Sequence, residues 1–157
     1  MRLLIRNMNE KFAKQIGNWR YPAPYDFYNI ELDQETLKEL LENDYYTVLD
    51  HDEELVGFFC IGSSAKVPIG AEFGAYSEEL IDVGIGMKPE LTGQGYGSTF
   101  FSCILAYIRE QFQDVPLRLT VAKFNTRAIH LYKKLGFVKK TEFQRGSTVF
   151  ITMVRAG

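Results

Sequence analysis

The second half of the chain alternates strand-like and helix-like segments, and this order limits the possible folds more than any other feature. Residues 80–87 (LIDVGIGM) predict a strand that ends before Pro89, residues 98–112 predict a helix, and residues 117–124 predict a strand. A strand that is followed by a helix and a second strand usually forms a right-handed parallel crossover. One parallel strand pair is therefore expected.

The remaining segments predict antiparallel neighbours for that pair. Strands are expected over residues 3–8 and on either side of the polar turn 51–53, and two more form a hairpin around residues 144–146. Three further helices are expected, over residues 11–19, 33–44 and 125–135. The chain therefore predicts an α/β fold of the α+β kind, with a mixed and mostly antiparallel sheet.

Composition narrows the classes of protein. With 157 residues, of which 46% are hydrophobic, we expect a single domain over residues 1–157. A net charge of -2 argues against nucleic acid and against an anionic membrane as partners. No apolar run reaches the roughly 18 residues of a membrane span, and residues 1–7 are too short and charged for a signal peptide, which predicts a cytoplasmic protein. Either a monomer or a homodimer fits.

The two cysteines and two histidines of the chain lie far apart in the sequence. Cys60 and Cys103 lie in hydrophobic segments without metal-ligand spacing, so free buried thiols are expected. His51 belongs to a predicted turn, and His130 to the polar side of the last helix. No metal site is therefore expected.

The sequence LTGQGYGS at residues 91–98, which we call the glycine loop, has glycines at every second position before a predicted helix. A P-loop requires a Lys after its last glycine, and this loop has none. Its spacing, G-x-G-x-G, also differs from the dinucleotide-binding fingerprint G-x-G-x-x-G. The loop still has the features that both motifs use to bind an anion, namely backbone N–H groups and a helix N-terminus. No acid occurs between Ser98 and Arg109 to occupy that helix end.

The strand before the glycine loop has an unusual face. Alternation places Asp82, Gly84 and Gly86 on one side of it. Small residues there predict a bare track along which an extended ligand lies against the backbone. A bulge or a closely packed helix explains the glycines equally well.

These motifs together resemble the GCN5-related N-acetyltransferase (GNAT) superfamily. The resemblance rests on Pro89, on TGQGYG before a helix, and on N-x-x-A-x-x-L-Y-x-x-L-G-F after the next strand, from Asn125 to Phe137. It implies a seven-stranded sheet flanked by about four helices, and acetyl-CoA as cosubstrate. Its pyrophosphate site maps to Gly93, Gln94, Gly95, Tyr96, Gly97 and Ser98, and its pantetheine and thioester contacts map to Ile85, Gly86, Met87 and Asn125. The family often has Arg or Gln where this chain has Thr92.

The same resemblance implies roles in acetyl transfer to an amine. Tyr132 corresponds to the tyrosine that protonates the leaving thiolate, although it also lies on an apolar helix stripe that suits a core residue. Asp82 is the candidate base, acting through water or by holding the ammonium, and a structural role for it is equally open. Other members have a Glu where this chain has Thr120. Asn125 is also the expected N-cap of the last helix.

Residues 19–30, which we call the aromatic segment, are expected near the acceptor. Trp19, Tyr21, Tyr25 and Tyr28 are candidates for a lid or a cation-binding wall, and a packed loop is the alternative. Three functions follow: an acetyltransferase for a small amine, one for a peptide N-terminus or a lysine, or a CoA-binding module without catalysis.

Overall fold

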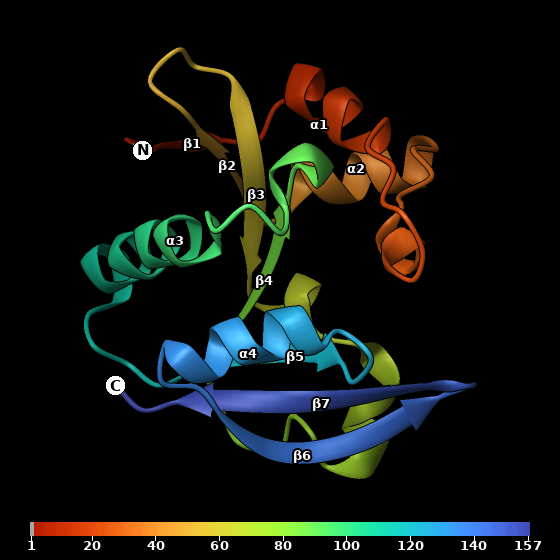
Figure 1. Ribbon diagram of the computed structural model, residues 1–157. Coiled ribbons are helices and arrows are strands. Elements are labelled where there is room, and N and C mark those ends of the chain that lie inside the picture. The colour runs from red at the N-terminus through yellow and green to blue at the C-terminus, as the bar shows by residue number, and fades with distance from the viewer. Residues whose placement is uncertain (1) are drawn as a thin grey trace. The chain divides into compact units, whose positions relative to one another are not determined.

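The computed structural model describes residues 2–157 (Figure 1). The helices are α1 (Glu10–Gly17), α2 (Gln34–Glu42), α3 (Gly97–Phe112) and α4 (Thr126–Lys134). The strands are β1 (Leu4–Asn7), β2 (Tyr45–Leu49), β3 (Leu55–Ile61), β4 (Ile81–Met87), β5 (Leu117–Ala122), β6 (Val138–Arg145) and β7 (Thr148–Arg155). Each expected helix and strand is present, with its ends within a few residues of the predicted ones.

The strands form a mixed sheet in the order β1-β2-β3-β4-β5-β7-β6. β4 and β5 are parallel, with Ile81 opposite Leu117 and Asp82 opposite Arg118. The pairs β1–β2, β2–β3, β5–β7 and β6–β7 are antiparallel. The predicted seven-stranded, mostly antiparallel sheet with one parallel crossover is confirmed.

The chain divides into two compact units that are interleaved in sequence. The first contains the residues up to Cys60 together with Ile85–Ile104, and the second contains Ile61–Gly84 together with Leu105–Gly157. Strand β4 and helix α3 are therefore each shared between the units. That residues 1–157 act as one domain stays a prediction.

The core of the first unit forms around α1. The Asn9 side chain accepts a hydrogen bond from the Phe12 N–H at 2.9 Å and so caps the helix. Phe12, Ile16 and Trp19 then pack in a buried cluster with residues from β2 and β3. Apolar residues at this spacing lie on one helix face, which explains why α1 covers the sheet on that side.

In the second unit, α4 lies along β5, β7 and β6 (Figure 1). The β6–β7 turn lies further along the chain than predicted, because β6 continues to Arg145 and Gly146 turns with a φ angle of 58°. The segment 63–79, which connects β3 to β4, contains two short 3-10 turns, Ser63–Ala65 and Pro68–Phe73.

Candidate active site

A loop and a helix N-terminus follow β4 in the first unit. After a 3-10 turn at Pro89–Leu91, the glycine loop leads into α3, whose first residue is Gly97. Gly93 and Gly95 have φ angles of 70° and 87°, in the left-handed region that residues with a side chain rarely adopt. A Cβ atom at Gly95 would meet no heavy atom within 4 Å. The glycines therefore serve the backbone conformation, and the space beside Gly95 is open.

The amide groups of the glycine loop are free to bind a ligand. The Thr92 N–H donates to the Pro89 carbonyl oxygen at 3.2 Å, and the next backbone bond runs from the Phe100 N–H to the Tyr96 carbonyl oxygen at 2.9 Å. Between these bonds, no N–H group of the loop donates a well-aligned backbone hydrogen bond within residues 2–157, although residues 92–95 form a turn with weaker hydrogen-bond geometry. The first turn of α3 contains no acid, so the helix dipole attracts an anion there. The predicted pyrophosphate residues lie at this place, exposed or half-buried: Gly93, Gln94, Gly95, Tyr96, Gly97 and Ser98. They fit a phosphate group.

The predicted bare track along β4 is covered at Gly86. A Cβ atom there would collide with the ring of Phe58 from β3, so Gly86 is small because Phe58 packs over it. The neighbouring Gly57 is equally constrained, since its Cβ atom would lie 2.6 Å from the Gly86 carbonyl oxygen. Close packing explains Gly86, but a side chain of the neighbouring strand provides it, and not the packed helix that the sequence left open. Contact of Ile85, Gly86 and Met87 with a pantetheine arm stays a prediction.

The end of β4 is bonded to the aromatic segment. The Tyr21 hydroxyl donates to the Met87 carbonyl oxygen at 2.6 Å, and the Lys88 N–H donates to the Val56 carbonyl oxygen at 2.8 Å. Burial, and secondarily the charge of Glu90, raises the pKa of Tyr21 far above its usual value. The hydroxyl therefore remains protonated and acts as a hydrogen-bond donor.

The aromatic segment divides into buried and accessible rings. Trp19 is buried, with its ring centroid 6.0 Å from that of Phe58, so the packed alternative applies to it. Tyr25 and Tyr28 are half-buried and begin and end a 3-10 turn that follows the prolines. Phe27 in the same turn is exposed and packs edge-on against Tyr28. Contact of Tyr25 and Tyr28 with the acceptor stays a prediction.

Asp82 lies in the second unit and forms a buried ion pair that the sequence analysis missed. Its two carboxylate oxygens accept bonds from Arg118 at 2.7 and 2.8 Å, and the two residues are 1% and 3% exposed. The hydrogen bonds that Arg118 donates to Asp82 raise the pKa of Arg118, which remains a cation. This arrangement favours the structural role for Asp82.

The signal for this pair was present in the sequence. Arg118 is the one charged residue within the strand LRLTVA, as Asp82 is within IDVGIGM, and a parallel register places them opposite each other. Arg118 also donates to the Glu78 carbonyl oxygen at 3.0 Å and lies 4.9 Å from the Tyr76 ring centroid. The Tyr76 hydroxyl bonds to Thr120 at 2.8 Å. Arg118 and Tyr76 thus fasten the segment before β4 to β5.

The other two predicted residues of the second unit belong to α4. The Asn125 side chain accepts from the Ala128 N–H at 3.2 Å, which confirms its capping role. Tyr132 is 8% exposed, with its ring 6.2 Å from that of Phe137. The contact of Asn125 with pantetheine and the proton transfer by Tyr132 stay predictions.

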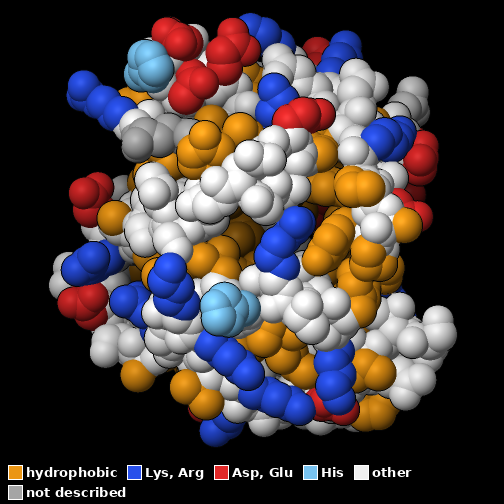
Figure 2. Space-filling view, viewed as in Figure 1, with side chains coloured by type: hydrophobic (Ala, Val, Ile, Leu, Met, Phe, Trp, Pro, Cys, Tyr) orange, Lys and Arg blue, Asp and Glu red, His pale blue; other side chains and the backbone are white. Residues whose placement is uncertain are grey.

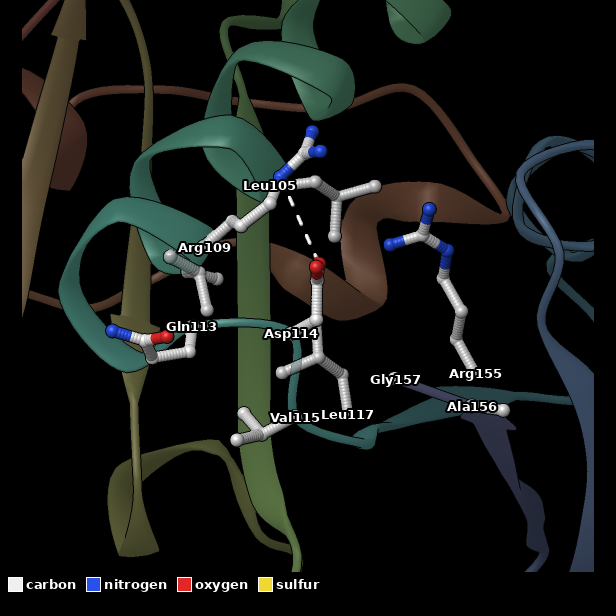
Figure 3. A pocket seen from close by; sticks show the side chains of 10 residues that line it. Leu105, Arg109, Gln113, Asp114, Val115, Leu117, Arg155, Ala156 and Gly157 are labelled. Carbon is white, nitrogen blue, oxygen red and sulfur yellow. Dashed lines mark ion pairs between the residues drawn. The ribbon is translucent and has the colours of Figure 1, made fainter.

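Two other surface features contain none of these residues. Lys and Arg side chains gather on the face where α4 and β6 lie (Figure 2), and both elements carry exposed lysines, among them Lys133 and Lys134 of α4 and Lys140 of β6. The small net charge of the whole chain gives no sign of this local gathering. A shallow pocket lies between the end of α3 and the end of β7 (Figure 3), where Arg109 and Asp114 are 3.9 Å apart.

The family model described as the acetyltransferase (GNAT) family matches residues 13–137. This chain belongs to the GNAT acetyltransferase family. Members use acetyl-CoA as acetyl donor. No curated protein sequence matches the chain. Within residues 2–157, no cluster of His, Cys, Asp or Glu could hold a metal ion, and no helix has the length and apolar character to span a membrane.

Several solved structures share the fold of this GNAT chain. A spermidine N-acetyltransferase from Vibrio cholerae in complex with CoA and spermine is 20% identical, with a TM-score of 0.72 over 97% of this chain and 94% of that one. A GNAT family acetyltransferase from Bacillus anthracis is 18% identical, with a TM-score of 0.73 over 99% and 95%. A putative phosphinothricin N-acetyltransferase is 15% identical, with a TM-score of 0.71 over 99% and 98%.

Proposed function

We propose that this GNAT protein transfers the acetyl group of acetyl-CoA directly to a primary amine, and that the acceptor is a small amine. The observation that carries the proposal is the glycine loop. Two left-handed glycines and a series of amides without well-aligned hydrogen bonds lead into a helix whose first turn has no acid. In a chain of this family, such a site suits the pyrophosphate of acetyl-CoA.

The loop amides and Ser98 hold the pyrophosphate in this proposal, and the thioester arm runs back beside Ile85, Gly86 and Met87. Asn125 caps α4 and contacts the arm. The Met87 N–H donates a hydrogen bond to the thioester oxygen as it becomes negatively charged. The amine nitrogen forms a bond to the acetyl carbon, the carbon–sulfur bond breaks, and Tyr132 gives a proton to the departing thiolate.

Attack by the amine itself is favoured over an acyl-enzyme route, because neither cysteine is activated. Cys60 is buried. Cys103 is half-buried, and its burial raises the pKa of the thiol. The thiolate is the nucleophilic form of cysteine, and burial disfavours it.

The acceptor amine gives its proton to water in this proposal. Both oxygens of Asp82 are engaged by Arg118, and protonation of Asp82 would weaken that pair. An alkylamine has a pKa near roughly 10 and is mostly ammonium at neutral pH. Since only the neutral amine attacks, kcat/KM should rise with pH in proportion to its fraction.

A small amine is favoured as acceptor over a peptide for two reasons. The Vibrio cholerae structure with the same fold is named as a complex with CoA and spermine, a small polyamine. In this chain, the rings of Tyr25 and Tyr28 are partly accessible and suit contact with an ammonium group.

Thiol release from acetyl-CoA tests the function directly, with a panel of small amines and of peptides with free N-termini or lysines. We expect turnover with one or more small amines, and stabilisation of the protein against heat by acetyl-CoA. Turnover with peptides that depends on their sequence would contradict the small acceptor. Heat stabilisation without turnover across the panel would favour the binding module. The absence of both heat stabilisation and turnover would overturn the proposal.

A further inference from the structure

The last peptide group of β4, between Met87 and Lys88, is held by hydrogen bonds at both ends. Its N–H donates to the Val56 carbonyl oxygen of β3 at 2.8 Å. Its carbonyl oxygen accepts the Tyr21 hydroxyl at 2.6 Å, across 66 residues of sequence. A peptide group with both polar atoms bonded to different elements has little freedom to rotate.

Tyr21 is itself held by the aromatic segment. Its N–H donates to the Asn29 side chain at 2.8 Å, which closes the segment on itself. The preceding Arg20 donates to the carbonyl oxygens of Gly17 and Trp19, at 3.0 and 2.7 Å. The hydroxyl is therefore presented to β4 from a well-fixed position.

A second contact joins the same two parts of the first unit. Trp19 packs against Phe58, and the Phe58 ring covers Gly86. The aromatic segment thus touches Met87 directly and reaches Gly86 through one ring. Both are residues against which the thioester lies in the proposed function.

We propose that Tyr21 is a positioning residue for acetyl transfer, rather than part of a wall that binds the acceptor. The Tyr21 hydrogen bond fixes the peptide plane between Met87 and Lys88. The Met87 N–H belongs to the preceding peptide plane, between Gly86 and Met87, and the two planes meet at the Cα atom of Met87. Because steric contacts leave few allowed φ and ψ values at Met87, fixing one plane restricts the orientation of the other, which keeps this N–H aimed at the thioester oxygen. Because burial raises the pKa of Tyr21, its hydroxyl stays protonated over the working range of pH. This inference rests on the proposed function.

The test is Tyr21→Phe, which removes the hydroxyl and keeps the ring. We expect kcat for a small amine to fall about tenfold or more, because a misplaced oxyanion donor weakens transition-state binding, with a change of less than about threefold in the Kd of acetyl-CoA. Amide hydrogen exchange at Lys88 should also become faster than in the wild type. Tyr46→Phe is the matched control, since Tyr46 is a half-buried tyrosine of β2 stacked on Phe59. This control variant should change neither kcat nor the rate of amide exchange at Lys88.

The outcomes separate this inference from the proposed function. Wild-type protein without turnover on any amine would refute the function, and with it the positioning role. Active wild-type protein and a Tyr21→Phe variant with unchanged kcat would refute the positioning role alone. A higher KM for the amine with unchanged kcat would also refute it, and would return Tyr21 to the acceptor wall.

Discussion

The glycine loop and the Asp82–Arg118 pair are both polar, but they differ in whether the protein satisfies their hydrogen-bonding groups. The carboxylate and the guanidinium are buried and bonded to each other. The loop amides between Thr92 and Phe100 donate no well-aligned backbone hydrogen bond within the described residues. Buried polar groups need protein partners, whereas exposed donors can await a ligand. The sequence suggested a ligand-binding role for the loop and a catalytic role for Asp82. The hydrogen bonds of the two regions favour the role of the loop and argue against that of Asp82.

The sharpest test of this difference is Asp82→Asn, which leaves the buried Arg118 without a counter-ion. We expect the free energy of unfolding to fall by about 3–5 kcal/mol, measured by urea denaturation. The matched control is Glu79→Gln, an exposed acid three residues earlier, which should have almost no effect. A loss in Asp82→Asn as small as that of the control would mean that the pair does not hold the second unit together.

A double variant separates stability from catalysis. Asp82→Asn combined with Arg118→Met removes both charges, and we expect it to regain much of the stability that Asp82→Asn loses. If Asp82 is structural, turnover should return along with the fold. A well-folded double variant that binds acetyl-CoA but shows no turnover would identify Asp82 as the base.

On the chemical step, the largest effect is expected for Tyr132→Phe. Loss of the proton donor should lower kcat about 100-fold, with the Kd of acetyl-CoA nearly unchanged, because the ring and its packing on Phe137 are kept. Steady-state turnover and calorimetric binding measure the two quantities. Unchanged kcat would assign Tyr132 to the core.

Gly95→Val addresses the other side of the comparison. A branched side chain at a φ angle of 87° forces the loop out of its shape, and we expect the affinity for acetyl-CoA to fall about tenfold or more as amide contacts are lost. Gly74→Val is the matched control, because Gly74 has a φ angle of 73° and similarly open space around its Cβ position. The control should lose stability but keep its affinity. Equal affinity in both variants would place the pyrophosphate elsewhere.

Local patterns predicted most of the fold, whereas contacts between distant residues escaped them. The period of the apolar residues and the helix cap expected at Asn125 sufficed for the elements, because these signals act within a few residues. The cover that Phe58 places over Gly86 depends on register between strands, which no local pattern reports. The bond from Tyr21 to Met87 depends on how a loop folds back. Candidate site residues could therefore be proposed where a contiguous motif carries them, whereas Arg118, the partner of Asp82, was missed because strand pairing brings the two together.

The smallest expected effect concerns Asn125, whose two roles can be measured apart. Asn125→Ala removes the cap of α4 and should lower the free energy of unfolding by about 1 kcal/mol. Asn125→Asp keeps an oxygen that accepts from the Ala128 N–H but loses the amide donor, so stability should be retained. If Asn125 also contacts the pantetheine arm, Asn125→Asp should weaken acetyl-CoA binding at wild-type stability. If it is a cap alone, affinity in that variant should match the wild type, and a polar residue of the second unit would again be explained by the partner it has within the protein.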